Sequence, residues 1–532
     1  MKLNRLYKHI IYFTACCLLF TVHCSAQEVI ELNLPKSEKI IVKLMFRNGS
    51  ISDPKGKEGL TNLTASLITE GGTVDKTSTE IKDEIYPWAA SYSSSVDKEV
   101  TIFTFEFHKD HVSKFYPILK GLIIAPRFDE EDFKRVKSNQ QNYVEQVIRS
   151  SSDEDYSKMA LEDFLFRGTN YQHQKQGTVS GVKSITLADA KAHYKMFFNA
   201  NNLIIGIAGN YQPDFLNTLK ADMKKLPDIS LSSEANQQPS EVNTLPTPAK
   251  PNKPDGIRVE IIAKDEALGS AIFTGFPLSI TRKDNDFAAL MIANSWLGEH
   301  RKSYSRLYQK IRQERSMNYG DYSYIEWYNN GGSNMLPAPG YPRWSNYFSI
   351  WIRPVQTAKG LKEQYKELSG ISIGHAHFAV RMAIREMDQM ITNGMSAEDF
   401  ELTKTFLRSY MKLYIQTPSR QLGFLMDSRF YGRKNYIAEI DTFLGKVTLA
   451  EVDNAIKKYW QTQNMFITIV TDKSEAEPLA KSLKENLPSP MSYSDALKAV
   501  LTPEILKVDD AVANYKLNVK DVKIVNSAET FQ

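Results

Sequence analysis

The feature that most constrains this fold is a repeat, because two stretches of the 532-residue chain follow the same plan. Residues 185–189 (ITLAD) match residues 447–451 (VTLAE), and the apolar run 202–208 matches the run 464–470, both at an offset of 262 residues (447 − 185 and 464 − 202). In each copy a Leu- and Lys-rich stretch then leads to a Leu-Pro pair. A helix cap, a strand and a closing turn that recur in the same order indicate a duplicated α/β unit.

A segment rich in proline and small polar residues separates the two copies. Residues 230–255 contain five prolines and few apolar side chains, a composition typical of an extended linker. Since the chain is also too long for a single core, we expect an N-terminal domain at 27–229, a linker at 230–255, a C-terminal domain at 256–490 and a tail at 491–532. Strand-like runs alternate with helical periods and no nucleotide-binding glycine loop is present, so we predict an α+β fold.

The first 26 residues have the character of an export signal. Three basic residues precede an apolar run at 10–22, and the small residues Ser25 and Ala26 follow it. We therefore expect cleavage after Ala26 and a periplasmic or secreted protein. An uncleaved membrane anchor is the alternative, although the run is short for a membrane span. A lipid anchor at Cys24 is disfavoured by the bulky His23 before it. No later segment is long and apolar enough to cross a bilayer.

Removing this segment changes the chemistry that the chain offers. All three cysteines (Cys16, Cys17 and Cys24) lie inside it, so the mature protein would have no disulfide, thiolate metal site or cysteine nucleophile. The formal charge falls from +4 to +1 (66 − 3 basic against 62 acidic residues), which gives no support for nucleic-acid or membrane binding. Neither a Gly-x-Ser-x-Gly elbow nor a phosphate-binding loop appears.

Residues 59–73 (GLTNLTASLITEGGT) have the frame of a known catalytic helix. The stretch resembles the zinc-binding helix of the M16 (insulinase or pitrilysin-like) metallopeptidases, which reads approximately Gly-Leu-Ala-His-x-x-Glu-His. In that H-x-x-E-H motif two histidines bind zinc and the glutamate activates a water molecule. Here Asn62, Ala65 and Ser66 hold the three positions. An amide, a methyl group and a hydroxyl can neither hold a catalytic zinc ion nor take a proton from its water.

The resemblance extends over about residues 38–490, in family order. In the first copy it includes residues 48–60, 170–178 and 208–210, and in the second it includes the stretch 303–320. It implies two tandem, duplicated M16-type α/β sandwich domains, each with helices packed on a mainly antiparallel sheet. In the family two such pairs close like a clam shell around a peptide, so this chain would supply half of a chamber.

The resemblance also implies positions for further site residues. The family's third zinc ligand is a glutamate downstream of the second histidine, so Glu145 is either a vestigial ligand or a solvated helix carboxylate. Peptidase members hold their substrate with an arginine and a tyrosine of the second copy. Arg353 and Tyr347 are the substrate-binding residues that this implies here, and Phe378, which has no hydroxyl, stands where the tyrosine would be. Arg353 could instead cap a strand or pair with a carboxylate.

Two histidine pairs and two apolar segments are the remaining candidates. His108 and His111 have the spacing of a chelate but lie where a strand gives way to a helix, which favours a solvated turn. A metal site at His375 and His377 is disfavoured because no acidic residue follows closely. The aromatic segment 322–347 is either a lip that contacts a partner or a peptide, or a packed hairpin. Residues 422–432 are expected to form a core helix that ends at a glycine.

These features predict an exported, non-catalytic M16 homologue that binds no cofactor itself. It would pair with a second M16 chain that carries an intact H-x-x-E-H motif and its zinc ion, and it would contribute chamber wall and contacts to peptide substrates. Two alternatives remain open. The first is a homodimeric peptide-binding protein without hydrolytic activity, and the second is an active zinc endopeptidase with a non-standard site, which would contain metal in the isolated protein.

Overall fold

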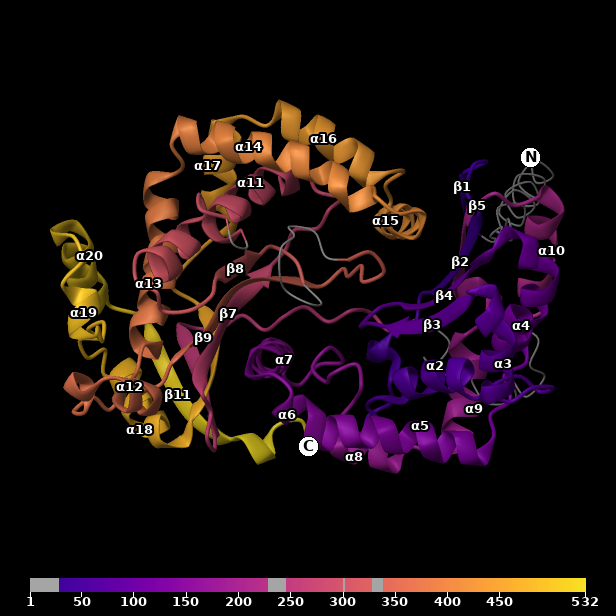
Figure 1. Cartoon of the computed structure of the whole chain (residues 1–532), viewed down its shortest axis with the longest axis horizontal. Helices are drawn as coiled ribbons and strands as arrows, with labels where there is room; N and C mark the ends of the chain where they lie inside the picture. The colour runs from indigo at the N-terminus through magenta and orange to yellow at the C-terminus, as the bar shows by residue number, and fades with distance from the viewer. Residues whose placement is uncertain (1–27, 228–244, 300–301, 328–337) are drawn as a thin grey trace, which may run out of the picture.

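The computed structural model describes residues 28–227, 245–299, 302–327 and 338–532, and these form two halves that are each built on one β-sheet (Figure 1). Sheet one has the strand order β1-β5-β2-β4-β3. β1 and β5 run parallel, and the other neighbours are antiparallel. The strands are β1 (Glu28–Asn33), β2 (Lys39–Phe46), β3 (Ser91–Val96), β4 (Thr101–His108) and β5 (Leu203–Gly209).

Helices cover one face of sheet one and leave the other face to the second half. Because side chains alternate along a strand, Val42 and Leu44 of β2 point into the helix-covered core, whereas Ile41 and Met45 point to the opposite face. The helices of this half are α2 (Leu60–Glu70), α3 (Ser78–Ile85), α4 (Val112–Ile124), α5 (Glu130–Asn142), α8 (Val179–Ser184), α9 (Leu187–Phe197) and α10 (Pro213–Met223).

Sheet two has the order β11-β6-β10-β7-β9-β8. β6 runs parallel to both β10 and β11, and the other neighbours are antiparallel. The strands are β6 (Ile257–Lys264), β7 (Gly269–Leu278), β8 (Asp321–Tyr324), β9 (Asn346–Gln356), β10 (Met465–Asp472) and β11 (Val519–Asn526).

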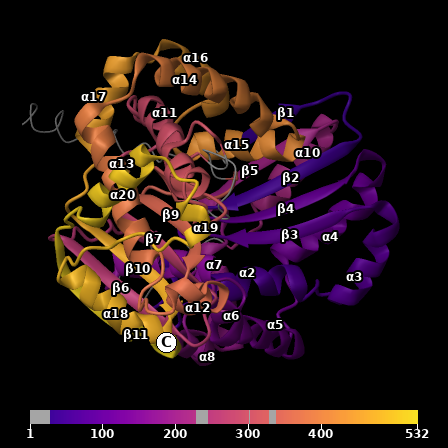
Figure 2. The ribbon, with the colours of Figure 1, turned by 60° about the vertical axis from the view of Figure 1, so that its left-hand side comes forward.

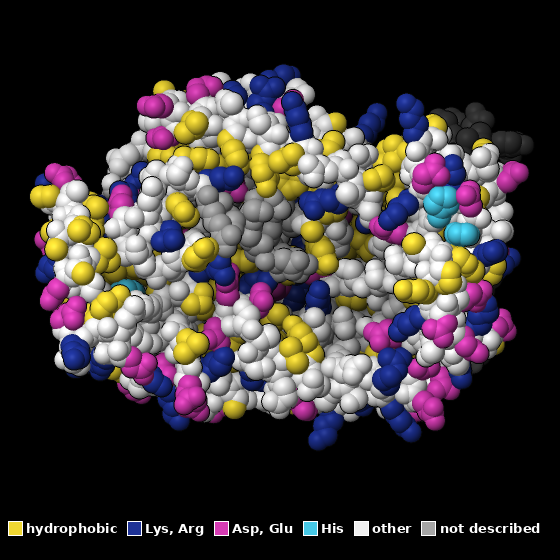
Figure 3. Space-filling view, in the orientation of Figure 1, with side chains coloured by type: hydrophobic (Ala, Val, Ile, Leu, Met, Phe, Trp, Pro, Cys, Tyr) yellow, Lys and Arg dark blue, Asp and Glu magenta, His cyan; other side chains and the backbone are white. Residues whose placement is uncertain are grey.

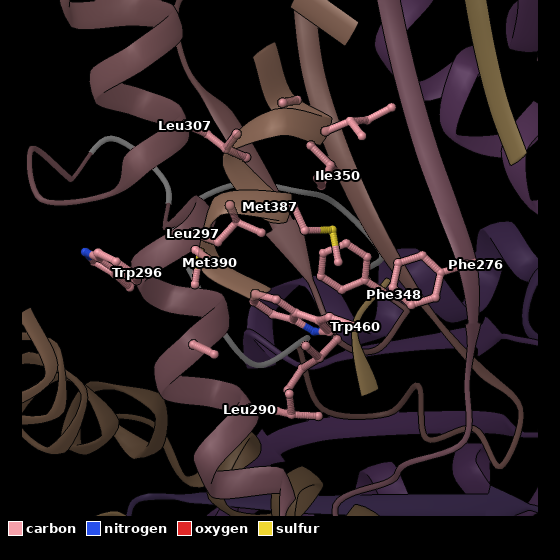
Figure 4. Close-up of a cluster of buried hydrophobic side chains, with 14 of the residues drawn as sticks. Phe276, Leu290, Trp296, Leu297, Leu307, Phe348, Ile350, Met387, Met390 and Trp460 are labelled. Carbon is pink, nitrogen blue, oxygen red and sulfur yellow. The ribbon is translucent and has the colours of Figure 1, made fainter. Parts of the chain in front are cut away.

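The largest hydrophobic core lies between sheet two and its helices (Figure 4). Phe348 of β9 stacks on Phe276 of β7 with ring centroids 4.9 Å apart, and Trp460 packs on Phe348 at 5.2 Å. The helices are α11 (Phe287–Gly298), α12 (Ala358–Gln364), α13 (Ala376–Asn393), α14 (Ala397–Met411), α16 (Tyr436–Lys446), α17 (Leu449–Tyr459), α18 (Lys473–Lys484), α19 (Asp495–Lys498) and α20 (Pro503–Ala513).

The predicted duplication is confirmed by the topology. The order β1-β5-β2-β4-β3 in the first half recurs as β6-β10-β7-β9-β8 in the second, with the first pair parallel in both. The matched sequence stretches open equivalent helices, since α9 and α17 both begin with a capping box, Thr186 with Asp189 and Thr448 with Glu451. Two tandem α/β domains are therefore correct.

Each half lends one helix to the sheet of the other (Figure 2). Helix α7 (Asp153–Phe166) packs on β7 and β10 of sheet two, and α15 (Pro418–Phe430) packs on β1, β2 and β5 of sheet one. Gly206 of β5 makes room for α15, because a Cβ there would lie 2.5 Å from the sulfur of Met426. The segment 422–432 is thus a core helix as predicted, but its core lies between the two halves.

Residues 491–532 are not a tail. They form α19, α20 and β11, and β11 pairs with β6 along the edge of sheet two. β11 has no long apolar run, and none of its residues is fully buried, so its sequence offers little sign of a position in the sheet. The predicted signal segment and most of the linker lie outside the described residues, while the part of the linker from residue 245 onwards follows the end of α7, where Asn252 N donates to Leu165 O at 2.7 Å. No helix in the described ranges has the length and apolarity of a membrane span.

Candidate functional site

Helix α2 carries the three degenerate motif positions, and its N-terminus is rigidly held. Gly59 precedes it with a φ of +101°, and a Cβ there would lie 2.4 Å from Gln176 O. The buried carboxylate of Asp53 accepts hydrogen bonds from Gly59 N and Thr61 N, both at 2.7 Å, and from Thr61 Oγ1 at 2.6 Å. A carboxylate at this position satisfies free amides and complements the helix dipole. The N-terminus of α2 is therefore fixed by a glycine turn and a buried carboxylate.

Two histidines that the sequence analysis did not single out support this cap. His173 Nε2 lies 3.1 Å from Asp53 Oδ2, and His193 Nε2 lies 2.9 Å from Thr61 Oγ1. Burial lowers the pKa of His193 to about 4, against the opposing charge of Asp53, so this ring is neutral at pH 7. Both rings lie under the first turn of α2 and serve its cap. Both histidines are far in sequence from residues 59–73, so no local pattern predicts this role.

Asn62 and Ser66 lie one helical turn apart on the partly exposed face of α2, and Ala65 is fully buried. Asn62 Nδ2 donates to Gln140 Oε1 at 2.9 Å. Gln140, on α5, in turn donates from Nε2 to Gly59 O at 2.9 Å and to Gln176 O at 2.8 Å. Two uncharged amides joined in this way offer no anionic ligand and no general base.

The structure places Gln140, rather than Glu145, next to the motif. Glu145 lies in a π-helical turn, η4 (Tyr143–Val147), where its exposed carboxylate accepts a hydrogen bond from Gln141. The side chain of this helix that reaches Asn62 is Gln140, whereas the carboxylate of Glu145 is bonded to Gln141 of its own helix. Of the two roles predicted for Glu145, a solvated helix carboxylate fits this position better than a vestigial ligand.

The free edge of sheet one runs beside α2. β3 is the last strand of the sheet, and Ser94 Oγ lies 3.2 Å from Thr69 Oγ1 of α2. From the second half, Tyr341 approaches the same strand and accepts a hydrogen bond from Ser95 Oγ at 3.1 Å. The molecule is hollowed between the two halves (Figure 3). The open face of α2, an edge strand and a segment of the second half are thus close neighbours.

The predicted substrate-binding residues of the second half are engaged within the protein. Arg353 Nε donates to Glu154 Oε2 of α7 at 2.9 Å, and Nη1 lies 3.4 Å from the hydroxyl of Tyr322. Tyr347 is buried in a cluster with Leu165 and Phe166. Phe378 is fully buried in α13. Arg353 keeps about a third of its side chain exposed, so of these residues it has the most access to a ligand.

The aromatic segment 322–347 contributes mainly to packing in its described part. Tyr322, Tyr324 and Trp327 lie in the cluster between the halves, and Trp344 remains partly exposed. Arg343 from the same segment donates to both carboxylate oxygens of Asp97 at 2.6 and 2.7 Å and to Glu162 at 2.8 Å. Its guanidinium lies 3.8 Å above the Trp327 ring. The packed-hairpin alternative describes these residues, and residues 328–337 lie outside the described part.

This buried network joins both halves around Arg343. Burial alone would raise the pKa of Glu162, but Arg343 and Lys98 beside it hold that pKa at about 2. Burial raises the pKa of Glu99 to about 7, against hydrogen bonds from Tyr171 and from the backbone of Trp344. Paired and fully hydrogen-bonded charges of this kind fix one relative position of the elements they join.

The two histidine pairs do not form metal sites. His108 and His111 lie at the strand-to-helix turn as expected, where His108 Nδ1 accepts from Asp110 N at 3.2 Å. His375 and His377 are buried, bonded to Ser492 O at 2.9 Å and Ser482 Oγ at 3.2 Å, and burial lowers the pKa of both rings. Across the described ranges, no three His, Cys, Asp or Glu side chains are grouped so that they could hold a metal ion.

Two family models match most of the chain. Residues 28–178 match insulinase (peptidase family M16), and residues 184–347 match the peptidase M16 inactive domain. A protein of Helicobacter pylori named non-peptidase homolog YmxG is 24% identical over 437 residues, which cover 82% of this chain and 89% of the relative. An uncharacterized zinc protease YmxG of Bacillus subtilis is 21% identical over 317 residues, covering 59% and 71% of the two chains.

Solved structures share the fold. A peptidase M16 inactive domain from Pseudomonas fluorescens superposes with a TM-score of 0.68 at 17% identity, covering 84% of this chain and 96% of that one. A protease from Helicobacter pylori gives a TM-score of 0.66 at 13% identity, covering 84% and 97%. These likenesses establish the same two-domain architecture. With the two family models and the duplicated topology in agreement, the chain belongs to the insulinase (M16) family.

Proposed function

We propose that this protein is an exported, non-catalytic subunit that works with a second M16 chain carrying an intact H-x-x-E-H motif. The observation that carries the proposal is the contrast within α2, where the supporting cap at Asp53 is intact and the ligand positions hold Asn62 and Ser66. The partner chain would supply the zinc ion, the general base and the activated water. This chain would supply wall and peptide contacts.

The hydrogen-bonded amides of Asn62 and Gln140 favour a supporting role over a non-standard catalytic site. The Asn62 amide is hydrogen-bonded to Gln140, whose own amide is bonded to two backbone carbonyls. Satisfied amides of this kind stabilise the local fold and leave no ligand waiting for a metal. The name non-peptidase homolog, given to the Helicobacter pylori relative, fits the same conclusion for that protein and supports it here.

Peptide contact is best supported at the edge of sheet one. An edge strand presents unpaired amides and carbonyls, and an extended peptide can pair with them as an added strand. β3 has this position and carries serines at residues 91, 93 and 95. Small side chains leave space beside the strand for a peptide of varied sequence. We therefore infer that the substrates are extended, unfolded peptide segments.

The first test is a pull-down of the mature protein from its own host, followed by zinc analysis and peptidase assays. We expect an M16 chain with H-x-x-E-H to co-elute, zinc to be present at about one equivalent per partner chain, and activity to appear only in the mixture. Mass spectrometry of the recovered chain should find Gln27 at its N-terminus in the periplasmic or secreted fraction.

The alternatives predict other outcomes of the same experiment. A stable homodimer that binds peptides, with neither partner nor activity, would replace the supporting role by peptide sequestration. Stoichiometric zinc or chelator-sensitive activity in the isolated chain would overturn the proposal in favour of a non-standard catalytic site.

A further inference from the structure

Residues 527–532, which we call the strap, leave sheet two at the end of β11 and lie against helices of the first half. Arg149 Nε donates to Ser527 O at 3.0 Å, and the Tyr156 hydroxyl donates to the same carbonyl at 3.1 Å. Val179 N donates to Phe531 O at 3.1 Å. The donors come from α6 (Ile148–Ser150), α7 and α8, so three elements of the first half bind the backbone of the strap.

Phe531 anchors the strap in a pocket shared by both halves. Its side chain is buried with Ile148, Tyr156 and Ala160 of the first half and with Ile262 and Val470 of sheet two. Its ring meets that of Tyr156 edge-on at 5.7 Å and 65°. A buried aromatic ring surrounded by backbone hydrogen bonds is the usual form of a peptide anchor.

The backbone of Phe531 adds a second sign that this contact is specific. Its φ is +56°, which lies in the left-handed region that residues other than glycine rarely adopt. Such a conformation persists only where the surroundings over-determine it. The hydrogen bond at its carbonyl and the burial of its ring are the contacts that do so.

The π-helical turn η4 sets Arg149 in place for this contact. Arg149 Nη1 donates to Val144 O at 2.6 Å and to Glu145 O at 3.0 Å, and Nη2 donates to Thr530 O. A π-helical turn interrupts the regular ladder of helix hydrogen bonds and leaves carbonyls available. One guanidinium therefore joins the turn to the strap through charge-assisted hydrogen bonds, which are stronger than neutral ones.

The strap also forms one wall of a cavity of about 650 Å³ between the halves, where Thr530 and Phe531 face Arg167 and Glu260. Three of the charged groups that line the cavity are joined, since Arg167 donates to Asp163 at 2.8 Å and to Glu260 at 2.6 and 3.0 Å. Lys55, Glu58 and Glu529 also line it.

We propose that Arg149, Tyr156 and Val179 form a peptide-binding groove whose resident ligand is the strap, and that this binding ties sheet two to the first half. The groove selects a short helical turn, formed here by Ser527–Glu529, followed by a phenylalanine that enters the shared pocket. The proposal stands on contacts within this chain and does not depend on the supporting role.

The decisive experiment supplies the strap in trans. A chain truncated after Asn526 is titrated with a fluorescent peptide Ser-Ala-Glu-Thr-Phe-Gln, and anisotropy reports binding. We expect saturable binding to the truncated chain, none to the full chain, and affinity lower by about tenfold or more for the matched peptide with alanine in place of phenylalanine. A folded truncated chain that binds neither peptide, or both equally, overturns the proposal.

Full-length variants decide the matter if the truncated chain does not fold. Phe531→Ala and Arg149→Ala should lose hydrogen-exchange protection at the Val179 amide and increase the radius of gyration in small-angle scattering. Val500→Ala, at a side chain 75% exposed, is the matched control and should change neither quantity. Unchanged hydrogen-exchange protection at Val179 in both Phe531→Ala and Arg149→Ala would overturn the proposal.

Discussion

Helices α2 and α11 occupy equivalent places in the two halves but differ in access. α2 packs on α5, α9 and β3, and α11 packs on the corresponding elements α14, α17 and β8. Along α2, Asn62, Ser66 and Glu70 form a partly exposed row, whereas all twelve residues of α11 are buried. The second half covers α11 further with α16.

The difference shows what separates each of the two helices from a metal site. A metal site needs ligands of the right chemistry and also a surface that solvent and substrate can reach. In the second half α11 is fully buried, so this helix offers neither suitable ligands nor a surface that solvent can reach. The first half has a reachable face that carries Asn62 and Ser66 beside Gln140, so side-chain chemistry rather than access separates it from a zinc site.

The largest expected effect comes from restoring ligands on the open helix. The variant Asn62→His, Ser66→His, Gln140→Glu should bind about one equivalent of zinc, because two imidazoles one turn apart then face a carboxylate. Metal analysis after dialysis measures this directly, and chelator-sensitive thermal stabilisation gives a second readout. Peptidase activity is not expected, because Ala65 still lacks a base.

The two-histidine variant Asn62→His, Ser66→His is the matched control and distinguishes the candidate third ligands. It retains Glu145 and should bind zinc weakly, since the structure puts residue 140 beside residue 62. Zinc binding as tight in the control as in the triple variant would show that a residue other than 140, such as Glu145, supplies the third ligand.

A cavity in the closed helix should cost far more stability than a truncation on the open one. Leu290 of α11 is fully buried, so Leu290→Ala should lower the free energy of unfolding by about 2–5 kcal/mol. Ser66→Ala on the partly exposed face of α2 should change it by less than about 0.5 kcal/mol. Urea titrations followed by circular dichroism measure both, and similar losses for the two variants would remove the contrast between the helices.

The next largest expected effect is a dependence of the free energy of unfolding on pH, caused by buried carboxyl groups at equivalent edges of the two sheets. Burial raises the pKa of Glu99, beside β3, to about 7 and that of Asp321, at the start of β8, to about 8. Both values lie above those of an unfolded chain, so the folded protein holds protons that the unfolded one releases. The contribution of these two groups to the free energy of unfolding is therefore greatest below about pH 4, and it is lost as the pH rises through their folded pKa values.

Amide variants separate the two contributions. In Asp321→Asn the free energy of unfolding should lose the part of its decrease with pH that ends near pH 8, and in Glu99→Gln the part that ends near pH 7. Each of these parts is on the order of a few kcal/mol. Urea unfolding at several pH values checks this against the wild-type curve. A wild-type stability that rises with pH between about 5 and 8, with no difference in the variants, would contradict both assignments.

The sequence predicted the repeat well because capping boxes and buried strands are local signals. Thr186 with Asp189 and Thr448 with Glu451 could be read from four residues each, and the structure confirms both. The single helix that carries Asn62 and Ser66 could also be predicted, and α2 confirms it. These parts depend on spacing within a single element.

What the sequence could not predict depends on contacts between distant elements. Gln140 meets Asn62 across 78 residues and Arg343 meets Asp97 across 246, and no local pattern marks either pair. The exchange of α7 and α15 between the halves is hidden for the same reason, because an apolar helix face does not say which sheet it covers. Residues 491–532 resemble a tail in sequence because β11 is an edge strand with exposed lysines and no long apolar run.

The smallest effect concerns Arg353, where the two halves meet through Glu154 of α7. Its ion pair is partly exposed, so Arg353→Ala should lower the free energy of unfolding by no more than about 1 kcal/mol. If Arg353 only pairs with Glu154, then Glu154→Gln should have the same effect, and neither variant should change the affinity for an extended peptide. If Arg353 holds substrate, Arg353→Ala should weaken peptide binding while Glu154→Gln leaves it equal or tighter, because the guanidinium is then released from its carboxylate. Peptide titration of both variants therefore decides whether the second half contacts substrate through this arginine or uses it to hold α7 against sheet two.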